Sequence, residues 1–185
     1  AKMLKAFDPL LSNLLKEIPY PALSVCCFGY RKERVGKVLD GFGFLVPSKE
    51  RRAVLGTIVD SNVFPGRAPE DSILLRSMVG GARTPELGLL PDEQLISQVQ
   101  SDLRDMLGVS ADPDFIRIFR HQRAIPQYVV GHAERLQAID ENLQRHPGLV
   151  LTGNAFKGVS LNDCVVNAMR TAETLIPLPT RANTD

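Results

Sequence analysis

The sequence predicts an α+β protein whose sheet, antiparallel or mixed, is flanked by helices. Four short apolar segments without a helical stripe follow one another between residues 22 and 81, and Pro- or Gly-containing turns separate most of them. Segments with apolar residues every three or four positions come before and after this stretch. Because the predicted strands are grouped instead of alternating regularly with helices, the order of elements favours α+β over α/β.

The first predicted helix begins at Asp8 and Pro9, a capping residue followed by a proline suited to the first helical position. Leu11 and Ile18 belong to its apolar face, and Pro19 ends it. The four predicted strands that follow are residues 22–30, 41–46, 53–60 and 73–81.

The second half of the chain predicts three helices and two further strands. A helix opens at residues 91–93 and stops at Gly108, and residues 114–120 alternate as a strand does. Leu136, Ile139 and Leu143 mark the next helix. A strand at 149–152, a glycine-containing loop and a last helix from about 162 to 175 complete the order of elements.

Charge and composition exclude several classes of protein. The 22 Lys and Arg residues nearly balance the 21 Asp and Glu residues, so the basic surface typical of a nucleic-acid partner is not expected. The apolar runs are shorter than the ~20 residues of a membrane span. Adjacent Cys26 and Cys27 should point to opposite faces of a strand, which disfavours a disulfide between them.

The remaining cysteine and the histidines give no sign of a metal centre. An odd, low cysteine count fits a reducing compartment, so we expect a cytoplasmic protein, and we expect Cys164 to be buried. No histidine has a cysteine partner at ligand spacing, which predicts no metal site and histidines in surface or loop positions. These histidines are His121, His132 and His146.

The stretch "LTGNAFKGVSLNDC", residues 151–164, is typical of a strand, a tight turn and the start of a helix. Gly153 and Gly158 allow a ligand to approach the backbone closely, and Ser160 or Asn162 can cap the helix. Its N-terminal N–H groups would favour a phosphate or the carbonyl edge of a flavin. A well-capped helix after a glycine turn, with no ligand, explains the same residues.

Five motifs in order resemble the protoporphyrinogen oxidase family of the flavin-containing amine oxidase superfamily. The residues 153–164, "GNAFKGVSLNDC", are similar to its carboxy-terminal flavin motif. The other four motifs stand at close to the family's spacing, so the resemblance covers residues 3–175. They are "DGFGFLVPSKE" (40–50), "VLGTIVDSNVFP" (54–65), "MVGGAR" (78–83) and "IPQYVVGH" (125–132).

The resemblance implies FAD as cofactor and a tetrapyrrole as substrate, protoporphyrinogen IX being oxidised to protoporphyrin IX with oxygen as acceptor. It implies that four residues line the flavin: Asn154, Val159, Ser160 and Leu161. It also implies that Leu45, Ile58 and Met78 sandwich the tetrapyrrole rings, although burial in a sheet explains each of these apolar residues alone. No residue of the chain is expected to act as a catalytic acid, base or nucleophile.

The resemblance also implies a division of the chain. Residues 1–130 would belong to the substrate domain, residues 131–178 would return as strand, loop and helix to a glutathione-reductase-like FAD-binding domain, and residues 179–185 would form a tail. The amino-terminal FAD-binding part, with its G-x-G-x-x-G turn, would be a missing partner, because no such motif occurs in these 185 residues. The chain is therefore expected to be a fragment that is inactive alone and binds FAD weakly.

Two alternatives remain at this point. Another flavoenzyme of the superfamily, acting on a carotenoid or polyamine, would share the flavin motif. A flavin-free binding module would fold alone and present an apolar groove. Peripheral association with the inner membrane and a homodimer are compatible with every one of these interpretations.

Overall fold

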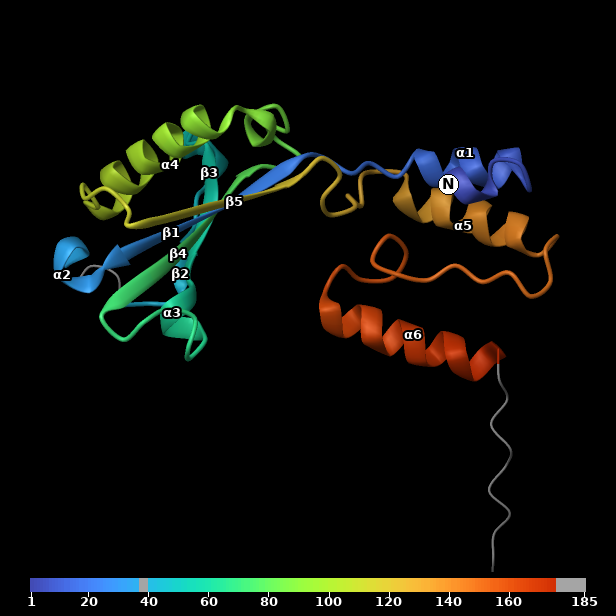
Figure 1. Ribbon diagram of the computed structural model, residues 1–185. Helices are drawn as coiled ribbons and strands as arrows, with labels where there is room; N and C mark the ends of the chain where they lie inside the picture. Colours follow the sequence, from blue (N-terminus) through green and yellow to red (C-terminus); the bar gives the residue numbers. More distant parts are fainter. Residues whose placement is uncertain (37–39, 176–185) are drawn as a thin grey trace, which may run out of the picture. The chain divides into compact units, whose positions relative to one another are not determined.

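The computed structural model describes residues 1–36 and 40–175, which form two compact units (Figure 1). The first unit joins Ala1–Tyr20 to the segment from Ile125 onward, and the second unit is Pro21–Ala124. The second unit is therefore inserted into the sequence of the first. The helices and the antiparallel sheet together agree with the predicted α+β class.

The second unit is built on a five-stranded sheet in the order β2-β3-β4-β1-β5, and every neighbouring pair is antiparallel. All five strands fall within or close to segments that the sequence predicts as strands. Their bounds are β1 (Leu23–Arg31), β2 (Gly43–Leu45), β3 (Val54–Val59), β4 (Ser72–Gly80) and β5 (Phe115–His121).

Helix α4 (Asp92–Leu107) covers one face of this sheet, as Figure 1 shows. Its buried residues Leu95, Val99 and Leu103 lie four apart and pack against alternate residues of β1 and β4. Such alternation puts Cys26 on the covered face and leaves Cys27 half-buried on the other. The apolar side of α4 therefore defines which face of the sheet is core and which is open.

Short helical turns that the sequence did not predict connect several of these elements. They have too few residues for a periodic apolar stripe to be recognised. Three are helices of 3₁₀ type, and two are single α-helical turns. Their bounds are η1 (Lys2–Leu4), α2 (Lys32–Val35), η3 (Ser48–Glu50), α3 (Asp60–Val63) and η4 (Leu87–Leu89).

In the first unit, α1 (Pro9–Lys16) packs against α5 (His132–Leu143). Their shared core contains Leu11, Ile18 and Ile139, all of them on predicted apolar faces, together with Ala155 from the loop before the last helix. Ala1–Tyr20 thus packs with the carboxy-terminal helices and not with the sheet unit.

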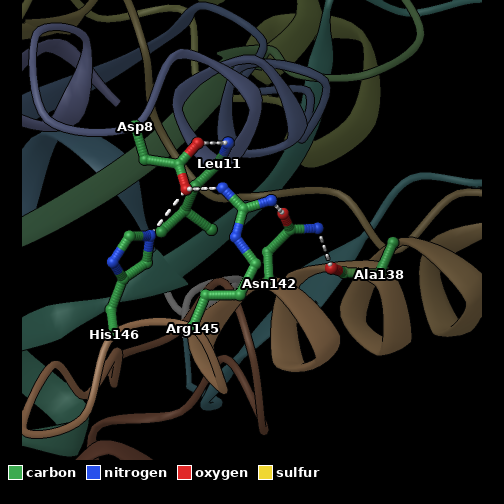
Figure 2. A network of polar contacts seen from close by, with 6 residues as sticks. All are labelled: Asp8, Leu11, Ala138, Asn142, Arg145 and His146. Atoms are coloured by element: carbon green, nitrogen blue, oxygen red, sulfur yellow. Dashed lines mark hydrogen bonds and ion pairs between the residues drawn. The ribbon is translucent and has the colours of Figure 1, made fainter.

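A polar network connects the start of α1 to the turn after α5 (Figure 2). Asp8 is buried and caps α1, because its Oδ1 accepts a hydrogen bond of 2.9 Å from the backbone N–H of Leu11. Its Oδ2 accepts from Arg145 at 3.2 Å and lies 2.6 Å from Nε2 of His146. These contacts, His146 first, hold the pKa of Asp8 below its usual value.

The predicted strand at 149–152 is wrong. These residues have no regular secondary structure. Among residues 1–36 and 40–175, β1 to β5 form the sheet, and residues 149–152 pair with none of them. Leu149 and Leu151 instead pack against the helical core around Ile139, which partly buries their apolar side chains without a neighbouring strand. Helix α6 (Leu161–Leu175) follows as predicted, but none of its residues is buried.

None of the helices within the described ranges has the length and apolar content that crossing a membrane requires.

Candidate functional site

The loop before α6 and the first residue of that helix, Leu161, carry the four residues predicted to line a flavin. Ser160 caps α6 in a reciprocal pair with Asp163, because the backbone N–H of Asp163 donates to Ser160 Oγ at 3.0 Å. The Ser160 hydroxyl and N–H in turn donate to Asp163 Oδ2 at 2.6 and 3.2 Å. This pair fixes the loop where it enters the helix.

Gly158 is required by this cap. Its φ of +83° belongs to the left-handed region, and a Cβ atom there would lie 2.5 Å from the carboxylate carbon of Asp163. Any side chain at position 158 therefore both strains the backbone and displaces the capping carboxylate.

The predicted flavin residues are accessible to a ligand. Val159 is 48% exposed, Leu161 is 80% exposed and Asn154 is half-buried. The N–H groups of Leu161 and Asn162, in the first turn of α6, have no intrahelical acceptor. Because the ionised Asp163 stands in the same turn, it opposes a fully charged anion, so the turn suits a polarised carbonyl edge better than a phosphate.

Tyr128 and His132 support this loop, and sequence reasoning gave neither a role. The Tyr128 hydroxyl donates to the backbone carbonyl of Asn154 at 2.7 Å. Burial raises the pKa of Tyr128, while a hydrogen bond with the Gly158 backbone acts in the opposite direction. The Tyr128 ring stacks on His132 at 4.2 Å between centroids. In the "QYVVGH" motif the two rings are four residues apart, and this spacing is the feature of the sequence that could have predicted their contact.

His132 and Cys164 correct two expectations. His132 is buried, and neither of its ring nitrogens has a hydrogen-bond partner among the residues that the structure describes. His146 lies in the turn after α5, which agrees with a loop position, although its contact with Asp8 covers most of the side chain. Cys164 is half-buried and not buried, because α6 lacks a covering layer within the described chain. Packing between distant segments, or its absence, determines the burial of His132 and Cys164, and no local pattern indicates it.

The three predicted tetrapyrrole residues lie on one face of the sheet, the face opposite α4. Leu45 pairs with Gly56, and Gly56 pairs with Met78, so these three positions form one row across β2, β3 and β4. Ile58 lies two residues along β3 from Gly56 and shares its face. The structure therefore brings together three residues that the sequence places 13 and 20 positions apart.

Gly56 allows Leu45 to lie across the sheet. A Cβ atom at position 56 would be 2.8 Å from Leu45 Cδ2 and 2.7 Å from the carbonyl oxygen of Phe44. Leu45 itself is 80% exposed, so it offers a large apolar surface on this open face. The Leu45 side chain therefore covers the Gly56 backbone and adds its own apolar surface to this face.

An open cavity of about 430 Å³ continues this face over β4, β1 and β5. Within it, burial raises the pKa of the Cys27 thiol, and the carboxylate of Asp60 raises it further. Cys27 therefore stays protonated at neutral pH and is a poor nucleophile. The lining also includes Arg76 and Arg117, which sequence reasoning missed although the alternation of residues 114–120 was recognised.

The two sets of predicted residues belong to different units. All four flavin candidates lie in the first unit, and all three tetrapyrrole candidates lie in the second. In the described part of the chain, no group of three His, Cys, Asp or Glu side chains is arranged to hold a metal ion.

A family model and several known proteins are similar to this chain. The model of the family described as flavin containing amine oxidoreductase matches residues 1–176. Protoporphyrinogen oxidase 2, chloroplastic/mitochondrial, of Arabidopsis thaliana is 34% identical over 178 residues, 95% of this chain and 35% of that protein. Coproporphyrinogen III oxidase of Propionibacterium freudenreichii is 32% identical over 177 residues, 95% of this chain and 33% of that protein.

A solved structure agrees with these relatives. The crystal structure of a protein from Exiguobacterium sp. 255-15, named as a candidate protoporphyrinogen oxidase, matches with a TM-score of 0.76 and 28% identity. The match covers 87% of this chain and 36% of that one. The chain thus spans about a third of the length of the relatives it matches. Since the family model matches nearly every residue, the chain belongs to the flavin containing amine oxidoreductase family.

Proposed function

We propose that this chain is the carboxy-terminal portion of an FAD-dependent oxidase that converts protoporphyrinogen IX to protoporphyrin IX with oxygen as acceptor. The observation that carries the proposal is the gathering of Leu45, Ile58 and Met78 on one uncovered sheet face. A large flat ring system needs apolar surface more than hydrogen bonds, and this face supplies it. The names of the Arabidopsis and Propionibacterium relatives support a porphyrinogen as the substrate class.

The cofactor would be held at its ring edge by the loop before α6. Asn154, Val159, Ser160 and Leu161 would contact the flavin, with the unpaired N–H groups at the start of α6 facing the pyrimidine edge. A flavin held there would supply the redox chemistry, namely acceptance of hydride equivalents from the substrate and transfer of electrons to oxygen. The Ser160–Asp163 pair would keep the helix start rigid, and Tyr128 would hold the loop through the Asn154 carbonyl.

The domain assignment follows from the same proposal. The sheet of the second unit would be the substrate-domain portion, and residues 131–178 would belong to the FAD-binding domain, whose amino-terminal part is a separate segment. We further propose a cytoplasmic enzyme, peripheral on the inner membrane, with a homodimer as the assembly to look for. Cell fractionation with and without a high-salt wash, and light scattering of the purified protein, test the two parts of this statement.

A coproporphyrinogen is the second candidate substrate. Among the residues that the structure describes, three arginines and one acidic residue, Asp60, line the cavity on the open face, which favours a substrate with several carboxylates. The Propionibacterium relative carries that substrate in its name.

The test uses the full-length protein that contains this chain. The purified protein should show a flavin absorption spectrum and should convert protoporphyrinogen to a fluorescent porphyrin above the rate without enzyme, with uptake of oxygen. Coproporphyrinogen, a polyamine and a carotenoid serve as competing substrates. Absence of flavin, or turnover of a polyamine or carotenoid without turnover of either porphyrinogen, would refute the proposal.

A further inference from the structure

Two arginines stand in one row across the middle of the open sheet face. Arg76 on β4 pairs with Cys27 on β1, and Cys27 pairs with Arg117 on β5. Neighbouring strands are about 4.8 Å apart, which places the two arginine Cα atoms roughly 10 Å from each other. Both side chains line the same cavity of about 430 Å³, with the small Cys27 side chain between them.

The two guanidinium groups differ in their partners. Arg76 is held by the buried carboxylate of Asp60, whose Oδ1 accepts from Nη2 at 2.8 Å and from Nε at 3.2 Å. Arg117 has no carboxylate within ion-pair distance among residues 1–36 and 40–175, and its guanidinium lies 5.6 Å from the centre of the Phe119 ring. A third arginine, Arg67, also lines the cavity. Arg67 likewise has no ion pair among the described residues, and its guanidinium lies 5.4 Å from the centre of the Phe64 ring. The cavity therefore has an excess of positive charge, and Arg117 is the unpaired cation that stands in the row with Arg76.

Apolar groups surround these charges. Phe115 and Phe119 flank Arg117 on the same face of β5 and are 53% and 48% exposed. Phe119 pairs with Val25, which pairs with Met78, so one continuous row connects this aromatic end of the sheet to the predicted tetrapyrrole residues. A partner that fits this face is flat and apolar at its centre and carries anionic groups at its edge.

We propose that the Arg76–Arg117 row is a carboxylate-binding subsite, which receives the acidic side chains of a tetrapyrrole whose rings lie on the row from Met78 to Phe119. The inference rests on the proposed function and adds to it the residues that recognise the substrate's charge. Guanidinium groups match carboxylates in geometry. They are also weakly hydrated, so a carboxylate can replace the water that contacts them in the ligand-free protein.

Arg117 is the informative residue to change. Replacing Arg76 would leave the buried carboxylate of Asp60 without its cation, so loss of binding in that variant would not separate recognition from folding. Arg117→Gln removes an exposed charge, and Arg117→Lys keeps the charge but loses the planar fork. Arg120→Gln is the matched control, because Arg120 is on the same strand but on the opposite face and pairs with Asp92.

The ligands are protoporphyrin IX, which has two carboxylates, its dimethyl ester, which has none, and coproporphyrin, which has four. Quenching of porphyrin fluorescence by the full-length protein gives each dissociation constant at low and high salt. Arg117→Gln should weaken binding of protoporphyrin IX by about tenfold and of coproporphyrin by more, and should leave the ester unchanged. Arg117→Lys should recover part of the loss, and Arg120→Gln should match the unchanged protein.

Two results would overturn the subsite. Unchanged binding of both acids by Arg117→Gln would show that Arg117 does not contact them, and equal weakening of acid and ester would show a general disturbance of the face. Failure of the unchanged protein to bind any of the three porphyrins would instead refute the tetrapyrrole function on which the subsite rests. The ester comparison thus separates the two kinds of failure.

Discussion

At Gly158 a single methyl group decides whether the loop before α6 can form. We expect Gly158→Val in the full-length protein to lose most of its flavin, because the left-handed backbone costs a β-branched residue about 1–3 kcal/mol. The new side chain would also displace the Asp163 carboxylate that caps α6. The absorbance ratio of flavin to protein measures the outcome.

The control for this variant is Gly148→Val. Gly148 also has a positive φ, of +88°, but nothing lies within 4 Å of a Cβ atom there. The Gly148→Val variant should have the same backbone strain and should still bind the flavin. Normal FAD occupancy in Gly158→Val would remove the loop from the flavin site.

Met78 tests the tetrapyrrole face at its centre. We expect Met78→Glu in the full-length protein to weaken porphyrin binding by at least tenfold, because the carboxylate must be desolvated beneath an apolar ring. The flavin spectrum should not change, since the loop before α6 belongs to the other unit. Met3→Glu, at a methionine that is exposed in the first unit, is the control for added charge. Lost flavin with unchanged porphyrin affinity would contradict the proposed slot.

Single residues also mark what the sequence could and could not predict. The capping roles of Asp8 and Ser160 were predictable, because the acceptor and the N–H that it binds lie three residues apart. The contacts of Asp8 with Arg145 and His146 were not, because 137 and 138 residues separate the partners. Likewise, Arg117 was recognised as part of a strand, but its neighbour Arg76 follows only from the register of β1 with β4 and β5.

At the scale of elements, periodicity predicted each helix longer than one turn within residues 1–36 and 40–175. The apolar faces of α1, α4 and α5 contribute to the two hydrophobic cores, so the predicted apolar faces are the ones that pack in the structure. The prediction of a strand at 149–152 was wrong because an apolar run indicates only that its side chains pack in the interior, and not in which element they do so. Leu149 and Leu151 are partly buried against the helical core, which no count of alternating residues distinguishes from packing in a sheet.

The junction of α1 with α5 predicts a dependence of stability on pH. Asp8→Asn keeps a cap for α1 but removes the charge that binds Arg145 and His146, so at pH 7 we expect a melting temperature lower by about 2–4 °C. Because folding lowers the pKa of Asp8, its ionic contribution is complete above its ordinary value of about 3.9 and disappears as the pH falls through the lower folded value.

Thermal unfolding followed by circular dichroism between pH 7 and pH 3 measures this difference. The difference in melting temperature between Asp8→Asn and the unchanged protein should be constant at neutral pH and should shrink as the pH falls below about 3.9. Glu17→Gln, which breaks the exposed pair with Arg135 in the same unit, should have a much smaller effect at every pH. A constant gap between Asp8→Asn and the unchanged protein across the range would show that the ionised carboxylate is not the source of stability.

At the scale of the whole molecule, the sheet unit and the helical unit differ in how completely their elements are buried. The sheet has a buried core closed by α4, whereas α6 in the helical unit has no buried residue. Its apolar residues Leu161, Val165 and Met169, spaced four apart, are exposed on one side. An exposed stripe of this kind is typical of a surface that another segment or partner covers.

This difference leads to the prediction that residues 1–185 alone neither bind FAD tightly nor oxidise protoporphyrinogen. The pyrophosphate and adenosine of a dinucleotide bind at a glycine turn of the first βαβ unit, and no G-x-G-x-x-G motif occurs in this sequence. The loop before α6 would touch only one edge of the isoalloxazine, so most of the cofactor would stay in water.

Titration of FAD into the purified 185-residue chain, followed by flavin fluorescence, tests this prediction. We expect no saturable quenching at micromolar FAD, whereas porphyrin should still bind to the open sheet face, because that face belongs to the unit with its own closed core. The same titration repeated after adding the separately expressed amino-terminal part of the protein should restore quenching. Stoichiometric quenching by the chain alone, or turnover of protoporphyrinogen above the rate without enzyme, would show that the loop and α6 suffice for the cofactor.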